Sequence, residues 1–195
     1  EQRSVAARDK FAEAANLNPD DCWLWFELGD LWIDTGNSNE ALAAYQQGKA
    51  AAERSGDDRD LSVSHNKIGN VLVAQGNLTQ ALAAFRASLD IAERLATADP
   101  KNSGWQRDLS VSQDTTGDVL VAHGNLTQAL DVFRASLDIR ERLAKDDPQN
   151  AGWQRDLSVS HNKMGDVLVA QGNLTGALAA FRASLDIAER LAKAD

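Results

Sequence analysis

Residues 105–143 read WQRDLSVSQDTTGDVLVAHGNLTQALDVFRASLDIRERL, and residues 153–191 repeat this sequence at 30 of 39 positions. The eight letters WQRDLSVS open both copies, at residues 105–112 and 153–160. The shorter string RDLSVS occurs a third time at residues 59–64, at the same spacing upstream. Self-similarity at a fixed period is the signature of a repeat architecture. The sequence therefore predicts an array of repeated units.

Each copy has the pattern of two helices joined by a tight turn. The first half of the 105–143 copy carries residues at i, i+4, i+7, i+11 and i+15 that share one helical face, namely Trp105, Leu109, Ser112, Thr116 and Leu120. Gly124 then ends the first helix, and we expect Thr127 to cap the next one. The second helix carries the apolar residues Leu130, Phe133 and Leu137 and stops before Pro148. The predicted fold class is all-α, a right-handed solenoid of antiparallel helix pairs.

The same pattern divides the whole chain into a single array of units. Residues 1–19 are expected to form the second helix of a preceding unit, followed by four full units. These units are 20–56, 57–102, 103–150 and 151–195. The chain starts with Glu1 rather than Met, so we expect it to be a mature chain or an excised piece of something longer.

Composition narrows the classes of function. The 195 residues are 43% hydrophobic, which is enough for a sizeable core. The net charge of −9 disfavours nucleic-acid binding, because a phosphate backbone would be repelled on average. No apolar run approaches the ~18 residues that span a bilayer, so no membrane partner is expected. The single cysteine, Cys22, excludes an intrachain disulfide framework and is typical of a cytoplasmic protein.

The repeated units resemble the tetratricopeptide repeat family. That family's pattern is W-x2-L-G-x2-Y, then A-x3-F, then P. Trp25-x2-Leu28-Gly29-x2-Trp32 followed by Ala41-x3-Tyr45 matches it, with Trp in place of the Tyr. The later units keep the motif's glycine and its A-x3-F element, at Gly69, Gly117 and Gly165 and at Ala81-x3-Phe85, Ala129-x3-Phe133 and Ala177-x3-Phe181. Where the family has a large apolar residue four positions before that glycine, this chain has His65, Gln113 and His161.

The 48-residue period of this chain is longer than that of the family, which is roughly 34 residues. The excess of 14 is close to four helical turns, so each helix can gain two turns and keep its faces in phase. We therefore expect helices of roughly 20 residues. WQRDLSVS is then the added start of the first helix, and the small side chains of Ser110 and Ser112 allow close helix approach.

No catalytic or metal-binding pattern emerges from the residues. His65 and His161 occupy equivalent places two units apart, too far for a shared metal, and His123 lies at a turn. The serines recur only because the unit recurs. The charged row Arg134-Asp138-Arg142 and its equivalents favour a solvated outer face of the second helix. We expect no enzyme activity, no cofactor and no metal in this segment.

The family resemblance implies a function in protein–protein interaction, as one part of a larger multidomain protein. In tetratricopeptide arrays the first helices line a concave groove that receives a peptide or helix of a partner. Carried onto this sequence, the groove residues are Trp23, Phe26, Asp30, Ile33, Asn66, Asn70, Arg107, Asp114, Asp118, Asn162 and Asp166. A chaperone-tail clamp is disfavoured, because the basic residue that such clamps use is Asn or Asp in the corresponding places.

The groove residues also suggest the chemistry of the partner. Trp23, Phe26 and Ile33 form an apolar stripe beyond what core packing needs, and aspartates follow it in later units. The expected partner is a protein or peptide that is apolar at one end and neutral or basic elsewhere. The alternative that the sequence leaves open is a structural scaffold, because neither end has a polar capping helix and uncapped ends would give weak self-association. A second alternative is that Trp23 and Phe26 are covered by a missing N-terminal unit or by the preceding helix.

Overall fold

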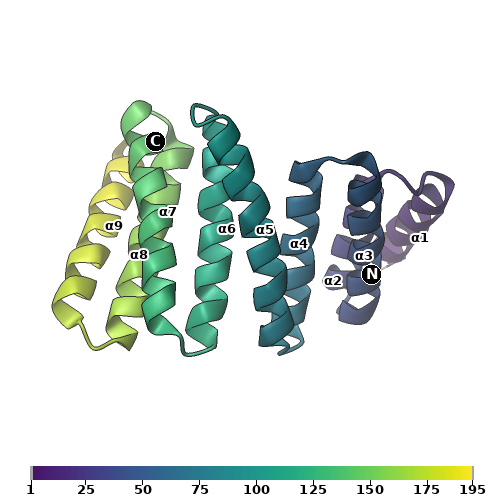
Figure 1. Ribbon diagram of the computed structural model, residues 1–195, viewed down its shortest axis with the longest axis horizontal. Helices are drawn as coiled ribbons and strands as arrows, with labels where there is room; N and C mark the ends of the chain where they lie inside the picture. Colours follow the sequence, from purple (N-terminus) through teal and green to yellow (C-terminus); the bar gives the residue numbers. More distant parts are fainter. Residues whose placement is uncertain (1, 195) are drawn as a thin grey trace. The chain divides into compact units, whose positions relative to one another are not determined.

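The structure is a computed structural model that describes residues 2–194, and within that range it contains nine α-helices and no strand (Figure 1). The helices are α1 (Gln2–Leu17), α2 (Cys22–Asp34), α3 (Ser38–Ser55), α4 (Asp58–Ala74), α5 (Leu78–Ala98), α6 (Ser103–Ala122), α7 (Leu126–Asp146), α8 (Ala151–Ala170) and α9 (Leu174–Ala194). The expected all-α fold is confirmed.

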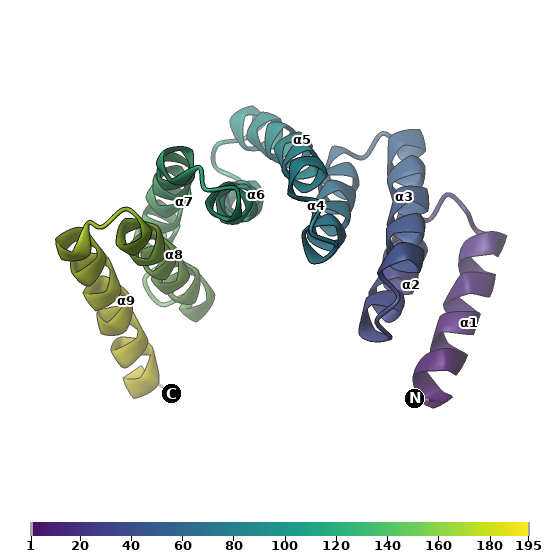
Figure 2. The ribbon, with the colours of Figure 1, turned by 90° about the horizontal axis from the view of Figure 1, so that it is seen from below.

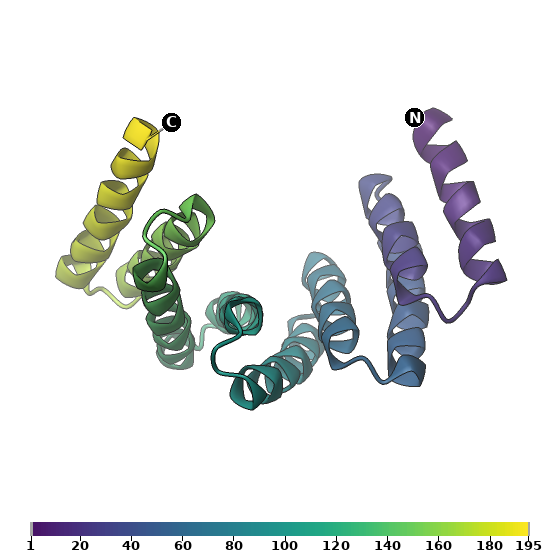
Figure 3. The ribbon, with the colours of Figure 1, turned by 90° about the horizontal axis from the view of Figure 1, so that it is seen from above.

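The helices form two compact units, Glu1–Leu95 and Ala96–Asp195. In the first unit α2 packs against α3, α3 packs against α4, and α1 lies beside α2 (Figure 3). In the second unit α6 packs against α7, α7 against α8 and α8 against α9 (Figure 2). The expected unit boundaries at 19/20, 56/57, 102/103 and 150/151 all fall between helices.

The turn inside a helix pair depends on one glycine. Gly124 has φ of 78°, a left-handed conformation that other residues adopt at a steric cost. The amide of Asn125 then donates to the carbonyl of Leu120, which satisfies one of the free carbonyls at the end of α6. The expected cap at Thr127 is wrong, because α7 starts at Leu126 and the residue before it is Asn125. Asn125 does not cap the backbone with its side chain, which donates to Gln128 instead.

The WQRDLSVS segment forms the start of α6 and of α8, as predicted. Asn102 and Asn150 cap these helices by accepting from the amides of Trp105 and Trp153. The expected length near 20 residues holds for α6 to α9, which have 20 or 21 residues each. The helix α2 has only 13 residues, because the first pair lacks this added segment.

A phenylalanine of the second helix packs against a glycine of the first. Phe133 in α7 is 3% exposed, and a Cβ on Gly117 in α6 would lie 2.5 Å from its ring. Any larger residue at 117 would push the ring out of its position. Ser110 and Ser112 of α6 are fully buried, and the hydroxyl of Ser136 in α7 donates to the carbonyl of Ser110 at 3.1 Å. Phe133 is therefore a core residue, as the sequence predicted.

The charged row on the outer face of α7 is exposed, as expected. Arg134 pairs within the helix with Asp131, at 3.8 Å, whereas Arg142 has its contact on α6. The guanidinium of Arg142 donates to Gln106 in α6, at 3.5 Å. In the first unit the equivalent Arg94 pairs with Asp58 in α4, at 3.1 Å. These long side chains therefore connect the two helices of a pair at the end opposite to the turn that joins them.

Candidate functional site

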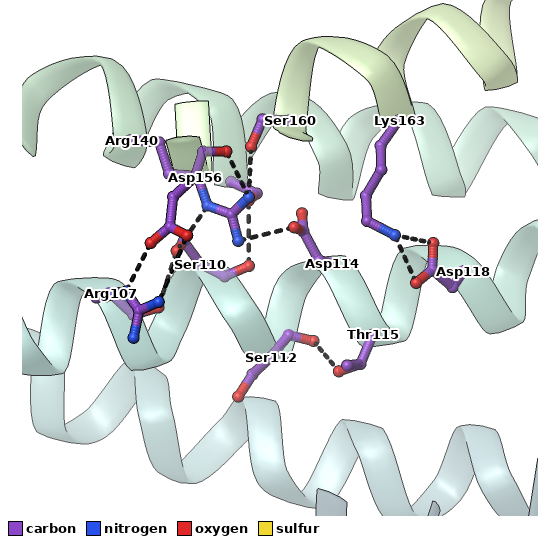
Figure 4. Close-up of polar contacts among 11 residues, drawn as sticks. Arg107, Ser110, Ser112, Asp114, Thr115, Asp118, Arg140, Asp156, Ser160 and Lys163 are labelled. Carbon is purple, nitrogen blue, oxygen red and sulfur yellow. Dashed lines mark hydrogen bonds and ion pairs between the residues drawn. The ribbon is translucent and has the colours of Figure 1, made fainter. Parts of the chain in front are cut away.

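Four of the five predicted groove residues of the second unit are exposed on neighbouring faces of α6 and α8, namely Arg107, Asp118, Asn162 and Asp166. Two ion pairs join these helices: Arg107 Nε lies 2.6 Å from Asp156 Oδ2, and Lys163 Nζ lies 2.6 Å from Asp118 Oδ1 (Figure 4). We call this surface the α6–α8 face. Its exposed residues are Arg107, Val111, Asp118, Val159, Asn162, Asp166 and Val169. The face therefore alternates apolar and polar side chains, which suits contact with another polypeptide.

Beneath the α6–α8 face lies a buried arginine. Arg140 of α7 is 4% exposed, and its guanidinium lies 2.8 Å from Asp114 of α6. It also donates to Ser110 Oγ of α6 at 3.1 Å. Its Nη1 donates to two groups of α8, the carbonyl of Asp156 and Ser160 Oγ, both at 2.9 Å (Figure 4). This one side chain therefore joins three helices of the second unit.

The expectation that Asp114 faces the groove is wrong. Asp114 is 5% exposed, because it turns inward to Arg140. Burial raises the pKa of its carboxyl, and the positive charge of Arg140 opposes that rise. One carboxylate oxygen, Oδ1, has no hydrogen-bond partner. Asp114 therefore belongs to the interior of the unit and not to its binding surface.

The acidic residues that do reach the surface are largely neutralised. Lys67 of α4 lies 2.7 Å from both carboxylate oxygens of Asp30 in α2, and the hydroxyl of Tyr45 donates to the same carboxylate. Burial, followed by this hydrogen bond, raises the pKa of Tyr45 above its usual range. In the second unit Lys163 Nζ likewise lies 2.6 and 2.7 Å from the two carboxylate oxygens of Asp118. Asp118 on the α6–α8 face is therefore paired, and Asp166 is the exposed carboxylate of this face that has no ion pair within residues 2–194.

The apolar stripe predicted for the first unit is only partly at the surface. Trp23 is 51% exposed and Ile33 is 41% exposed. Phe26 is 1% exposed, so the expectation that its ring is exposed is wrong. Its ring fills the space beside Gly48 of α3, where a Cβ would lie 2.5 Å from it. Trp23 packs edge-on against Phe26 with ring centroids 5.5 Å apart, so the core supports the exposed indole from below.

The remaining predicted residues differ in exposure. Asn70 is exposed on α4, whereas Asn66 is half-buried and its Oδ1 has no hydrogen-bond partner. Arg107 is exposed and held by Asp156, whose carboxylate raises the pKa of the guanidinium. The structure brings Arg107, Asp118, Asn162 and Asp166 together on the α6–α8 face. Trp23, Asp30, Ile33 and Asn70 lie on the first unit.

The histidines do not form a metal site. Burial lowers the pKa of His65 and of His161, so both favour the neutral form more than a free histidine does. Among the residues that the structure describes, no group of three or more His, Cys, Asp or Glu could hold a metal ion. In the same range no helix has the length and apolar character to cross a bilayer. Burial and then Asp60 raise the pKa of the Cys22 thiol to about 12, which leaves it unreactive near neutral pH.

Sequence reasoning missed Arg140, Lys67 and Lys163. A usable signal was present among the nine differences between residues 105–143 and 153–191. Asp114 becomes Asn162 and Arg140 becomes Ala188, so a charge of each sign disappears together. A joint change of this kind in two closely similar units points to a contact between the two side chains.

The sequence and the fold of the chain are similar to those of known repeat proteins. Two sequence profiles described as tetratricopeptide repeat match residues 20–94 and 160–195. No curated protein matches the chain in sequence. Several solved structures share its fold at low sequence identity. BtubC (BKLC) from P. vanneervenii superposes with a TM-score of 0.82 at 16% identity, over 97% of this chain and 74% of that one.

Two further structures extend this likeness in fold. MamA gives a TM-score of 0.68 at 14% identity, over 97% of this chain and 91% of that chain. A Podosopora anserina protein described as a putative kinesin light chain with nearly identical TPR-like repeats gives 0.72 at 12% identity, over 97% and 89%. The common feature is an all-α solenoid of helix pairs.

Proposed function

We propose that the chain binds a peptide or helix of a partner protein on the exposed faces of the first helix of each pair. The premise is that the chain belongs to the tetratricopeptide repeat family and is a protein-interaction repeat module. Exposed valines carry this proposal. Val111, Val159 and Val169 on the α6–α8 face are 36%, 42% and 47% exposed. Apolar side chains at such exposure beside Asn162 and Asp166 offer both contact area and hydrogen bonds to a bound backbone.

The ion pairs of the face refine the partner's chemistry. Because Lys163 neutralises Asp118, the α6–α8 face attracts basic residues only near Asp166. In the first unit, Trp23 and Ile33 offer an apolar contact beside the neutralised Asp30. The proposed ligand is therefore apolar where it meets Trp23 or the valines, and neutral or basic elsewhere. No catalytic role is proposed for any residue.

Site-specific crosslinking tests this assignment. A photoreactive amino acid is placed at Val159 on the α6–α8 face and, as a matched control, at Asp138 on the exposed outer row of α7. The proposal predicts that the Val159 variant captures a partner in cells and that the Asp138 variant does not capture the same protein. Binding of that partner to purified Val159→Asp should then fall about tenfold or more. Equal capture from both positions would overturn the assignment of the face.

Self-association is a second candidate, favoured by the exposed leucines of α9. Leu174, Leu178 and Leu185 are 67%, 51% and 56% exposed. The residue equivalent to Leu178 in the preceding pair is Leu130 in α7, which is only 8% exposed in a helix that packs against α8. A second copy that covers α9 would therefore reproduce a contact already present within the chain.

Sedimentation over a concentration series tests this second candidate. It predicts a mass that rises with concentration for the parent chain and stays monomeric for Leu178→Glu. Ala179→Glu, at an exposed position on the same helix, serves as the control. A parent chain that remains monomeric at millimolar concentration would exclude self-association as the function.

A further inference from the structure

The second unit has a cavity of about 380 Å³ away from the α6–α8 face, where the loop before α6 meets the end of α7. Pro100, Leu143 and Trp153 supply apolar walls, and Lys101, Gln106 and Arg142 supply polar groups. Sites for small ligands and peptide side chains start at roughly 300 Å³, so the cavity suits one or two side chains.

The cavity is a repeated feature and not an accident of one loop. A second cavity of about 340 Å³ lies where the loop before α8 meets the end of α9. Its lining includes Pro148, Gln154, Ile187, Arg190 and Leu191. Each of these residues lies one repeat period after Pro100, Gln106, Ile139, Arg142 and Leu143, which line the first cavity. The repeat unit therefore builds the same concave feature twice.

The glutamine of the WQRD segment is fixed in place. Gln106 Nε2 donates to the carbonyl of Ala96, and Gln154 Nε2 donates to the carbonyl of Ala144, both at 3.1 Å. These bonds leave the amide oxygen of Gln106 to accept from Arg142 at 3.5 Å. The guanidinium is thus held at the cavity by one long hydrogen bond among residues 2–194, and its other N–H groups remain available to a ligand.

The charges of the lining select the ligand. Lys101 and Arg142 face a single acidic neighbour, Asp146, and in the second cavity Arg190 is the charged residue of the lining. The lining of the first cavity therefore carries two cations and one carboxylate, although the chain as a whole carries −9. A carboxylate suits the planar guanidinium of an arginine, and the flat indole of Trp153 suits an apolar or aromatic side chain.

We propose that this cavity is a second binding site, for a partner segment in which an aspartate or glutamate adjoins an aromatic or aliphatic residue. The carboxylate pairs with Arg142 and Lys101, and the apolar side chain lies against Trp153 and Leu143. The first cavity binds the carboxylate more tightly than the second, because Gln149 of the second stands where the first has Lys101. The site is separate from the α6–α8 face, so the two proposals can fail independently.

Nuclear magnetic resonance of the full chain tests this site. The five tryptophans each give an indole N–H signal, and the signal lost in Trp153→Phe identifies Trp153. The probe is the capped tripeptide Glu-Phe-Glu, and the control is the capped tripeptide Lys-Phe-Lys. The expected result is a saturable shift of the Trp153 signal with the acidic probe and a much smaller one with the basic control.

Matched arginine variants separate the site from general charge attraction. Arg142→Gln should weaken binding of the acidic probe about tenfold, because it removes the main charged contact. Arg134→Gln removes an exposed arginine two turns earlier on α7 and should leave the affinity unchanged. No shift at millimolar probe, equal shifts with both peptides, or equal losses in both arginine variants would each overturn the proposal.

Discussion

The pairs α6–α7 and α8–α9 have nearly the same sequence, yet their interiors are held together differently. In α6–α7 a buried ion pair joins Asp114 to Arg140. In α8–α9 the equivalent residues are Asn162 and Ala188, and the serines Ser158 and Ser184 form a partly buried hydroxyl pair at 2.8 Å. The comparison teaches that near-identical repeats can differ in a coordinated way at a few positions without any change in fold.

Two of the side chains that differ between the pairs, Arg140 and Lys163, join the α6–α7 pair to α8. Arg140 reaches forward from α7 to two groups of α8. Lys163 reaches back from α8 to Asp118 of α6 and lies 5.7 Å from the ring centroid of Phe133. The residues that stand in their places in the other pair, Ala188 and Thr115, have no charge. These differences therefore hold the α6–α8 face in register.

The largest effect is expected from the phenylalanines of the two pairs. Phe133→Ala should lower the free energy of unfolding by roughly 3–5 kcal/mol, because its ring is fully enclosed between α6 and α7. Phe181→Ala should cost less, because the equivalent ring in α9 is only partly buried. Urea denaturation followed by circular dichroism measures both. Equal losses would mean that the two pairs are packed alike.

Removal of the buried arginine should have the next largest effect. Arg140→Ala leaves the carboxylate of Asp114 buried without a partner and should destabilise the chain by about 3 kcal/mol. Arg134→Ala, on the exposed row of the same helix, should cost under about 1 kcal/mol. The same urea titration reports both values, and similar losses from the two variants would show that Arg140 is not the connecting residue.

The two pairs also differ at His161 of α8, where α6 has Gln113. This difference should make the free energy of unfolding depend on pH. Burial lowers the pKa of His161, so the unfolded chain binds the proton more readily than the folded one. Stability is then full above the ordinary value of 6.5 and is lost as the pH falls through that value toward the folded pKa. His161→Gln should reduce the loss, while His65 still contributes in the same direction.

Urea midpoints at about pH 7.5 and about pH 5.5 measure this effect. His123→Gln, at an exposed turn, serves as the control. A His161→Gln variant that loses as much stability on acidification as the parent would contradict the assignment.

The smallest effect is expected from the surface ion pair. Lys163→Thr gives α8 the residue that α6 has at the equivalent position, Thr115. It should lower the free energy of unfolding by under about 1 kcal/mol, because Asp118 is half-exposed and solvent screens the ion pair. The variant should nevertheless leave Asp118 unpaired and make the α6–α8 face more acidic. A basic peptide probe that binds the variant no better than the parent would argue against this change in charge.

The sequence predicted the helix pairs and the packing of Phe133 in the core, because these depend on periodicity within one repeat. It failed at Phe26 and Asp114, because a helical face does not reveal what a neighbouring helix presents to it. Phe26 turns inward only because Gly48 leaves room for its ring. Asp114 turns inward only because Arg140, on the following helix α7, supplies a buried charge.

The surface position of the exposed groove residues can be predicted from the helical period alone. Val159, Asn162 and Asp166 lie on the side of α8 opposite its buried residues, so the helical period alone places them at the surface. Their exposure was therefore predictable, whereas the neutralisation of Asp118 by Lys163 was not. That contact joins residues 45 positions apart on different helices.

A double-mutant cycle on Asp114 and Arg140 tests most directly whether the differences between the two pairs act as one unit. Asp114→Asn and Arg140→Ala convert α6–α7 to the residues of α8–α9. We predict that each single variant is clearly destabilised and that the double variant regains most of the loss, with a coupling free energy of about 2 kcal/mol or more. Single effects that simply add, within about 0.5 kcal/mol, would contradict this account.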